Sequence, residues 1–323
     1  MFKRIRFFLE CSRYYTLPMS FFSWIIVFAY SLKSGGNPYY GLLALIGIMF
    51  AHLATNLFDD ICDYKKLSKV YNGKIELPNT QRGKCAYFIN GLLTTKQALL
   101  LFMSYCIISL LIGLFFVFKI GVFTLILAGI GALIVLLYSF LSYHSMSEIA
   151  VGAAFGPLLF EGVYYVMTGN ISIAPVILSL PSMFFTINLL FTDTFMDKDI
   201  DKNEGKLTLV NKLGAGKKAL AFQKLIVTFG YLSTLLLPAL NICGIKVLSV
   251  FLTLPLAVDL AKSLELYLET PDKLPQKRWY HFPFEAWEDI KQNRSVIFMF
   301  RMYQARNLMM YVSVILTVSV LWT

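Results

Sequence analysis

The sequence predicts an all-α polytopic membrane protein, and three observations lead to this fold class. Of the 323 residues, 57% are hydrophobic and only 15% are charged, and the mean hydropathy is +0.65. Nine apolar stretches are long enough to cross a hydrocarbon core of about 30 Å, which takes roughly 20 helical residues. The stretches are too long and continuous for tilted strands, and a helix satisfies its own backbone in lipid. We expect a single intramembrane domain over residues 1–323.

The nine predicted spans follow one another along the whole chain. They begin near Tyr14, Tyr40, Gln97, Gly121, Ser147, Ile173, Lys218, Ile245 and Phe298. The first lies close to the N-terminus, but it has no small-residue cleavage site and eight spans follow, so we interpret it as a retained span. Four helices separate the two acidic clusters described below, which predicts two four-helix repeats followed by a ninth helix.

The basic residues predict the orientation. Nearly all of the 29 Lys and Arg fall on one side of the predicted membrane, and the exceptions are Lys33, Lys119 and Lys246. By the positive-inside rule, this side is cytoplasmic and carries the N-terminus and three longer loops at about 64–96, 194–217 and 263–297. We expect a multi-pass protein of the cell (inner) membrane. The net charge of +10 is then a topology signal that favours anionic lipid, and no separate basic domain indicates nucleic acid.

Two further patterns concern the third loop and the cysteines. The stretch "KRWYHFPFEAWEDIKQNR" mixes aromatic and charged residues, which predicts an amphipathic helix in the headgroup region with Trp279 and Trp287 as anchors. The five cysteines are odd in number, scattered and without CxxC spacing, which indicates reduced thiols rather than disulfides or a zinc site.

An acidic row lies at the end of the sixth span, in "LLFTDTFMDKDIDKNEGKLTLVNKLG". Asp193, Asp197 and Asp201 recur every four residues, so on a helix they share one face. Like charges at this spacing cost some tenths of a kcal/mol per pair, so the row makes sense chiefly with cations between the side chains. Hard oxygen ligands indicate Mg²⁺ or Ca²⁺. Mg²⁺ commonly combines one or two carboxylates with substrate phosphates and water, which predicts a metal–diphosphate substrate.

A second acidic cluster, "NLFDDICDYKK" at 56–66, ends the second span on the same side of the membrane. It places three carboxylates, Asp59, Asp60 and Asp63, within five positions. Helix ends whose acids pair with neighbouring lysines would explain one such cluster but not two on the same side. His52 lies one turn before Asn56, and we interpret it as a packed, hydrogen-bonded residue.

These clusters resemble the two signatures of the UbiA-type intramembrane prenyltransferases, NDxxDxxxD and DxxxDxxxD. The second signature is matched in full and continues as GKxTLxxxLG from Gly205 to Gly214, similar to the subfamily that prenylates 1,4-dihydroxy-2-naphthoate for menaquinone. The first is matched at Asn56, Asp60 and Asp63, while Leu67 replaces its last Asp. The stretches "SRYYTLPMS", "NGLLTTKQA" and "SEIAVGAAFGPLLFEGVYYVMTG" extend the resemblance over most of residues 10–220.

The resemblance implies Mg²⁺-dependent transfer of a polyprenyl group from an allylic diphosphate to an aromatic acceptor, a dihydroxynaphthoate or related quinone precursor. It implies that the metal is held by the side chains of Asp60, Asp63, Asp193, Asp197 and Asp201, and that Asn56 adds or orients an oxygen ligand. From their loop positions, the predicted diphosphate contacts are Arg82, Lys202 and Lys206. Tyr138 and Tyr164 are predicted to shield an allylic cation.

Two departures from the family pattern add predicted substrate-site residues. In "YSFLSYHSMSE", where family members often carry a Lys or Arg, this chain offers only His144. Glu161 lies deep in the fifth span, where the family is usually apolar. A carboxylate within the membrane marks a functional site by default, and the alternative is a protonated Glu bonded to its helix.

Two other functions remain open at this point. A UbiA-type terpene cyclase would share the ionisation of a polyprenyl diphosphate but let the cation cyclise. A cation-coupled transporter is the less favoured reading, because transporter carboxylates lie near the bilayer midplane whereas these clusters lie at one interface.

Overall fold

The computed structural model describes residues 2–70, 85–285, 287–293 and 296–322, and these ranges contain helices and no strand. In the part of the chain so described, nine helical segments are long and apolar enough to cross a membrane. Each begins within two residues of its predicted position. The all-α fold class and the nine predicted spans are confirmed.

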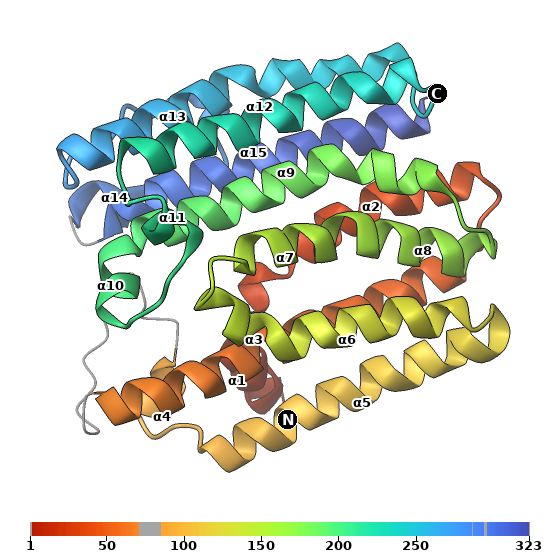
Figure 1. Cartoon of the computed structure of the whole chain (residues 1–323), viewed down its shortest axis with the longest axis horizontal. Coiled ribbons are helices and arrows are strands. Elements are labelled where there is room, and N and C mark those ends of the chain that lie inside the picture. The colour runs from red at the N-terminus through yellow and green to blue at the C-terminus, as the bar shows by residue number, and fades with distance from the viewer. Residues whose placement is uncertain (1, 71–84, 286, 294–295, 323) are drawn as a thin grey trace.

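The spans run back and forth along the long axis of the molecule (Figure 1). In order they are η1 and α2 (Tyr14–Thr16, Pro18–Lys33), α3 (Pro38–Val70), α5 (Thr95–Lys119), α6 (Phe123–Ser142), α7 with η3 and α8 (Ser147–Ala153, Ala154–Leu158, Leu159–Thr168), α9 (Ile173–Met196), α12 (Lys217–Ala239), η4 with α13 (Ile245–Thr253, Leu254–Glu269) and α15 (Phe298–Leu321). The connecting helices are α1 (Phe2–Cys11), α4 (Ala86–Ile89), α10 (Lys198–Asn203), α11 (Leu209–Lys212), η5 (Trp279–His281) and α14 (Trp287–Gln292). Figure 1 shows α4, α10, α11 and α14 at one end of the bundle, with the C-terminus at the other.

Helix α9 lies at the centre of the main core. It packs against α12, α15, α2 and the α7–η3 segment, and Phe185 and Phe191 on it are completely buried. By contrast, α5 and α6 expose large apolar side chains such as Leu100 and Phe118. Such outer faces suit hydrocarbon, whereas α9 is surrounded by neighbouring spans.

The fifth span touches α9 through two glycines four residues apart. A Cβ atom on Gly152 would lie 2.4 Å from Cγ1 of Ile187, and one on Gly156 would lie 2.8 Å from Cβ of Met183. Glycine pairs at this spacing let membrane helices approach closely. Gly156 departs from helical geometry, and Pro157 follows it, so the span bends just beyond the contact. The contact fixes the start of α7 beside the end of α9.

Among its described residues, the stretch 277–294 forms only the turn η5 and the short helix α14, not the single amphipathic helix that was predicted. The segment 270–285, before α14, folds back along α13 and α15. It contains only the single turn η5, because Pro271, Pro275 and Pro283 interrupt helical hydrogen bonding. Side chains of α15 satisfy its carbonyl groups: the amide of Asn307 donates to His281 O at 2.6 Å and to Pro283 O at 2.9 Å. Trp279 is 85% exposed, while Trp287 packs in an aromatic cluster near Phe300.

Candidate active site

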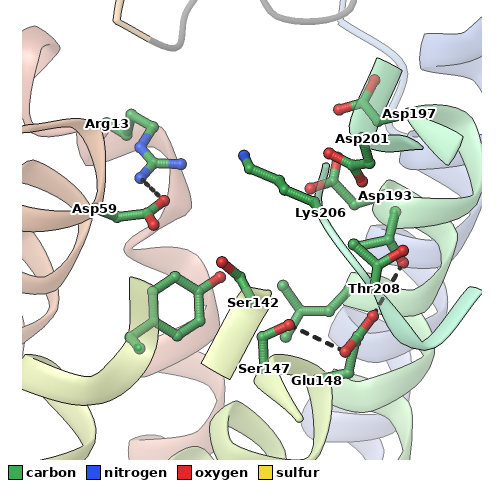
Figure 2. Close-up of a pocket in the computed structure, with 13 residues that line it drawn as sticks. Arg13, Asp59, Ser142, Ser147, Glu148, Asp193, Asp197, Asp201, Lys206 and Thr208 are labelled. Atoms are coloured by element: carbon green, nitrogen blue, oxygen red, sulfur yellow. Dashed lines mark hydrogen bonds and ion pairs between the residues drawn. The ribbon is translucent and has the colours of Figure 1, made fainter. Parts of the chain in front are cut away.

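An acidic cavity of about 70 Å³ lies where α3, α6, α7, α9 and α10 meet. It is lined by Arg13, Asp59, Tyr138, Ser142, Ser147, Glu148, Leu190, Asp193, Thr194, Asp197, Asp201, Lys206 and Thr208. Figure 2 shows Arg13 and Asp59 on one side of it, the three aspartates of the second acidic row on the other, and Lys206 extending between them. The two acidic clusters of the sequence therefore face one another across a single space.

The second acidic row lines this cavity with all three of its carboxylates. Helix α9 ends at Met196 and α10 begins at Lys198, so Asp197 lies at the junction. Backbone hydrogen bonds nevertheless continue across it, from Asp197 N to Asp193 O at 3.1 Å and from Asp201 N to Asp197 O at 2.8 Å. Because the helical repeat is preserved, residues four apart stay on one face.

In the first acidic cluster, one carboxylate lines the cavity and the other two lie beside the basic side chains of Arg13 and Lys206. Asp59 lines the cavity, whereas Asp60 lies 3.2 Å from Arg13 Nη2 and Asp63 lies 2.8 Å from Lys206 Nζ. Cys85 N–H also approaches Asp60 Oδ2, at 3.5 Å. The sequence ranked Asp60 and Asp63 above Asp59, yet it is Asp59 that reaches the cavity wall.

Arg13 is the cation on the α3 side. Its guanidinium lies 3.1 Å from Asp59 Oδ2 and also donates to Asn56 O at 2.9 Å. Burial opposes its charge, but Asp60 and Asp59 outweigh burial and raise the pKa of Arg13 above its ordinary value. The backbone of Arg13 has φ of 54°, in the left-handed region that non-glycine residues rarely adopt. Such a conformation persists where the surroundings hold it.

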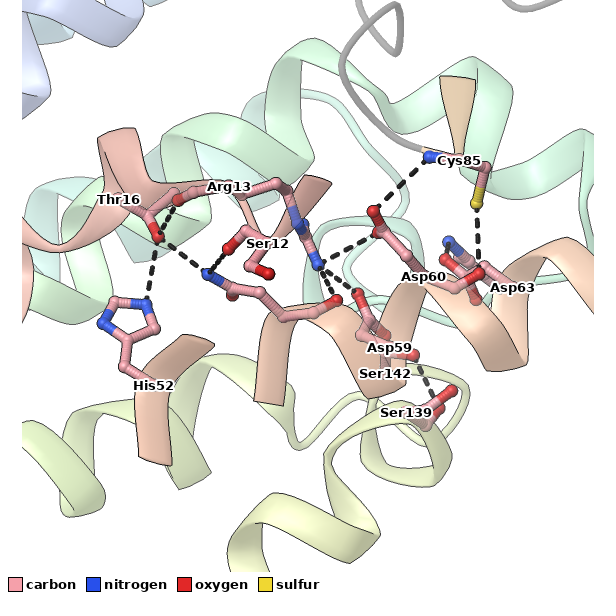
Figure 3. Close-up of polar contacts among 12 residues, drawn as sticks. Ser12, Arg13, Thr16, His52, Asp59, Asp60, Asp63, Cys85, Ser139 and Ser142 are labelled. Carbon is pink, nitrogen blue, oxygen red and sulfur yellow. Dashed lines mark hydrogen bonds and ion pairs between the residues drawn. The ribbon is translucent and has the colours of Figure 1, made fainter. Parts of the chain in front are cut away.

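A chain of hydrogen bonds holds Arg13 in that position, and Figure 3 shows it. The hydroxyl of Thr16 donates to Arg13 O at 2.9 Å and lies 3.1 Å from His52 Nε2, while Ser20 Oγ lies 2.7 Å from His52 Nδ1. The amide of Asn56 donates to Thr16 Oγ1 at 2.9 Å and to Ser12 O at 3.2 Å. His52 is thus a packed, hydrogen-bonded residue, and the amide nitrogen of Asn56 points to the N-terminal segment.

Lys206 is the cation on the other side, and a local turn places it. Gly205 has φ of 74°, and the backbone N–H of Lys206 bonds to Asp201 O at 2.7 Å while that of Gly205 bonds to Lys202 O at 3.1 Å. This pattern closes a helix C-terminus and requires a residue that tolerates positive φ. The turn directs the buried side chain of Lys206 toward Asp63, whose other oxygen accepts from Tyr143 Oη at 3.4 Å.

The charges of the cavity favour a divalent cation. Its lining holds two cationic side chains and five carboxylates, namely Asp59, Glu148, Asp193, Asp197 and Asp201. Carboxylate oxygens fit the hard-ligand chemistry of Mg²⁺. Among the residues that the structure describes, no three His, Cys, Asp or Glu side chains converge on one point as metal ligands.

The other predicted site residues are spread more widely. Tyr138 lines the cavity, whereas Lys202 is exposed outside it. His144 is exposed, stacks on Phe140 with ring centroids 4.0 Å apart, and does not line the cavity. Arg82 lies outside the described residues.

Glu161 and Tyr164 lie toward the opposite end of the fifth span. Glu161 is 14 residues beyond Ser147, about 20 Å along the helix. Its carboxylate accepts from Ser172 N–H at 3.1 Å, in the connection to α9 and outside its own helix. The ring of Tyr164 lies tilted by 40° against that of Tyr30, with ring centroids 5.9 Å apart. Neither residue lines the cavity.

Among the charged residues that line the cavity, sequence reasoning missed two, Arg13 and Glu148. In the sequence, Arg13 is one of the basic residues that predict the topology, and Glu148 lies in the stretch "SEIAVGAAFGPLLFEGVYYVMTG". A signal was present: each charge stands directly at the start of an apolar span on the side of the acidic clusters. Charges at such boundaries meet the ends of neighbouring helices, so they are candidates for a shared site.

Comparison with solved structures places this fold among known ones. The structure resembles a digeranylgeranylglyceryl phosphate synthase with a TM-score of 0.61 at 21% identity, covering 99% of this chain and 100% of that one. It also resembles a UbiA homolog from Archaeoglobus fulgidus bound to GPP and Mg²⁺, with a TM-score of 0.56 at 13% identity, covering 94% and 99% of the two chains. These likenesses establish the fold.

Sequence relatives point to the same group. UbiA prenyltransferase domain-containing protein 1 of Mus musculus is 25% identical over 135 residues, and that of Ailuropoda melanoleuca is 25% identical over 139 residues. Each match covers 42% of this chain and only 39% of the relative. The family model for UbiA prenyltransferases matches residues 18–286. With most of the chain matched, and with every residue that lines the acidic cavity except Arg13 inside the matched region, the protein belongs to the UbiA prenyltransferase family.

Proposed function

We propose that this protein transfers a polyprenyl group from an allylic diphosphate to an aromatic acceptor in a Mg²⁺-dependent reaction. The acceptor we favour is a dihydroxynaphthoate or a related quinone precursor. The observation that carries the proposal is the cavity in which carboxylates of α3 face those of α9 and α10, with Arg13 and Lys206 between them. GPP, DMAPP and Mg²⁺ in solved relatives support the diphosphate half, and the GKxTLxxxLG resemblance supports the acceptor.

In this proposal, carboxylates of both acidic clusters bind the metal. The ligands are drawn from Asp60, Asp63, Asp193, Asp197 and Asp201, with Asp59 added because it lines the cavity. Mg²⁺, when bound, supplies positive charge that stabilises the departing diphosphate. Asn56 acts through the N-terminal segment to which its amide donates.

The remaining residues serve the ionisation of the allylic diphosphate. The C–O bond to the prenyl group breaks, and both electrons leave with the diphosphate. Arg13 and Lys206 provide fixed positive charge for the leaving group, an electrostatic effect that is strong in a buried site. The ring of Tyr138, on the cavity wall, shields the allylic cation through its π face. The electron-rich ring of the acceptor then attacks the cation.

We also propose that the cavity opens to the cytoplasmic side of a cell (inner) membrane. The support is the distribution of Lys and Arg in the sequence, which places the acidic clusters and the N-terminus on the basic side.

The test is a product assay that pairs prenyl diphosphates of several lengths with dihydroxynaphthoate and other aromatic acceptors, with Mg²⁺ and with chelator. We expect a prenylated acceptor only with Mg²⁺, and a loss of at least about 100-fold in Asp197→Asn. Asp199→Asn is the matched control, because Asp199 is exposed and pairs with Lys198 at 2.9 Å outside the cavity. Transfer that persists in Asp197→Asn, or cyclic hydrocarbons formed without acceptor, would overturn the proposal.

A further inference from the structure

One carboxylate of the cavity has no part in the proposed handling of metal and diphosphate. Glu148 stands at the start of α7, on the side of the cavity that also carries Ser142 and Ser147. It is 1% exposed, and its side chain borders the cavity. A charged side chain buried to this degree is almost always paired.

The partners of Glu148 are hydroxyl groups. Ser147 Oγ donates to Oε2 at 3.0 Å, and Thr194 Oγ1 donates to Oε1 at 3.2 Å. Among the described residues, no Lys or Arg forms an ion pair with this carboxylate. An ionised carboxylate accepts about four hydrogen bonds, and two are made here. Because the group lines a cavity, a donor on a bound molecule would complete its hydrogen bonding.

The position of Glu148 is fixed by the packing of two spans. Gly152, one turn along α7, meets Ile187 of α9, and Thr194 two turns further along α9 donates to Glu148. The carboxylate is therefore held between two rigid helices. Its partner Thr194 directly follows Asp193, the first residue of the acidic row. A group held in this way presents a fixed acceptor to a ligand, which lowers the cost of orienting it.

We propose that Glu148 binds the acceptor through its hydroxyl group and removes the hydroxyl proton as the new bond forms. This inference rests on the proposed function and assigns it an acceptor class, a hydroxyl-bearing aromatic. The hydroxyl donates to Glu148, which increases electron density on the acceptor ring. The diphosphate leaves with both electrons of the C–O bond, the ring carbon then bonds to the allylic cation, and the O–H proton passes to the carboxylate. The product is the keto tautomer of the prenylated acceptor, and charge and atoms balance.

The experiment compares transfer with hydrolysis, since an allylic cation that finds no acceptor reacts with water. The full-length protein receives a prenyl diphosphate, Mg²⁺ and a dihydroxynaphthoate, and both the prenylated product and the free prenol are measured. We expect the ratio of transfer to hydrolysis to fall about 100-fold or more in Glu148→Gln, in line with the loss of a general base. Glu148→Asp, which keeps the carboxylate, should recover part of the ratio. Asp199→Asn should leave the ratio unchanged.

A second arm replaces the acceptor hydroxyl by its methyl ether. The wild-type protein should strongly prefer the free hydroxyl, and Glu148→Gln should use both acceptors at similar low rates. An unchanged ratio in Glu148→Gln, or transfer and hydrolysis falling together as for a metal ligand, would overturn the inference. If the wild-type protein ionises none of the prenyl diphosphates, the proposed function fails instead, and the absence of both products identifies that case.

Discussion

The ammonium of Lys206 lies 2.8 Å from Oδ2 of Asp63, a residue 143 positions earlier in the chain. Both side chains are buried, with 4% and 2% exposed. The pair joins the turn after α10 to the end of α3, so it connects the two halves of the acidic cavity. Breaking a buried pair leaves the remaining charge poorly solvated, which makes the pair a structural as well as an electrostatic element.

We predict that Lys206→Met lowers the free energy of unfolding by about 3–5 kcal/mol, because the substitution removes the cation from a buried carboxylate. The measurement is the unfolding midpoint of the purified protein in detergent. Lys206→Met combined with Asp63→Asn should recover part of the loss, since neither charge then remains. Lys202→Met is the matched control, because Lys202 is exposed and such changes stay within about 0.5 kcal/mol. Equal midpoints for Lys206→Met and wild type would contradict the role of the pair.

The hydroxyl of Thr16 is predicted to act through Arg13. Thr16→Val keeps the shape of the side chain but removes the hydrogen bonds to Arg13 O and His52 and the one from Asn56. If a less well positioned Arg13 weakens the binding of prenyl diphosphate by about 1.4 kcal/mol, the KM for this substrate rises about tenfold. The change in kcat should be smaller. Thr16→Ser should behave as wild type.

A double-mutant cycle separates this effect from simple damage to the fold. In an Arg13→Ala background, Thr16→Val should raise the KM no further, because the group that it positions is gone. The same tenfold change in both backgrounds would mean that the hydroxyl does not act through Arg13.

Asp59 is predicted to lower the Mg²⁺ concentration that gives half-maximal activity. It lines the cavity and lies 3.1 Å from Arg13, which also contacts Asp60. Asp59→Asn keeps an oxygen ligand and removes one charge from a buried position. Two unit charges about 4 Å apart attract by about 1 kcal/mol even in water, so the loss is at least of this size. We expect the Mg²⁺ concentration for half-maximal activity to rise about fivefold, with the rate at saturating Mg²⁺ retained. Asp60→Asn should be more damaging at every Mg²⁺ concentration. An unchanged Mg²⁺ dependence in Asp59→Asn would exclude this role.

The sequence predicts well what depends on local chemistry. The spans begin within two residues of their predicted positions because apolar runs and their polar boundaries are read directly. The row Asp193, Asp197 and Asp201 follows from the helical repeat. Rotation is harder to predict: Asp59 lines the cavity, and Arg13, 46 positions earlier, lies near both Asp59 and Asp60, a contact that no local pattern contains.

The position of a residue along a span decides whether it can reach the cavity, and Glu161 is an example. Glu161 accepts a hydrogen bond from Ser172, at the end of the fifth span opposite Ser147. The number of residues between Ser147 and Glu161 is enough to predict that Glu161 lies at that end. A Glu within an apolar helix is rare and therefore predicts a functional site, but the residue type alone does not show which side chains it contacts in the fold. The segment 270–285 illustrates the same limit, because its fold depends on Asn307 and its neighbours in a later helix.

The last prediction concerns the pH dependence of stability at His281, in the segment that folds back along α13. Its Nδ1 accepts from Arg278 N–H at 3.3 Å, its Nε2 lies 3.0 Å from Asp259 Oδ2, and its ring is 1% exposed. Burial lowers the pKa of His281, and the Asp259 carboxylate only partly offsets burial. The unfolded chain binds a proton near pH 6.5, whereas the folded protein binds it only at lower pH. The stabilisation is therefore complete above about pH 6.5 and is lost as the pH falls from there to the folded pKa.

The unfolding midpoint of the wild-type protein, measured from about pH 8 to about pH 5, should fall through this window. His281→Gln cannot titrate there, so its midpoint should change less with pH even if it is lower throughout. His144→Gln is the matched control, because His144 is exposed and its replacement should leave the wild-type slope. If His281→Gln keeps the full slope, protonation elsewhere controls stability. The hydrogen bonds from the Arg278 backbone and to Asp259 then have no part in the acid sensitivity of the protein.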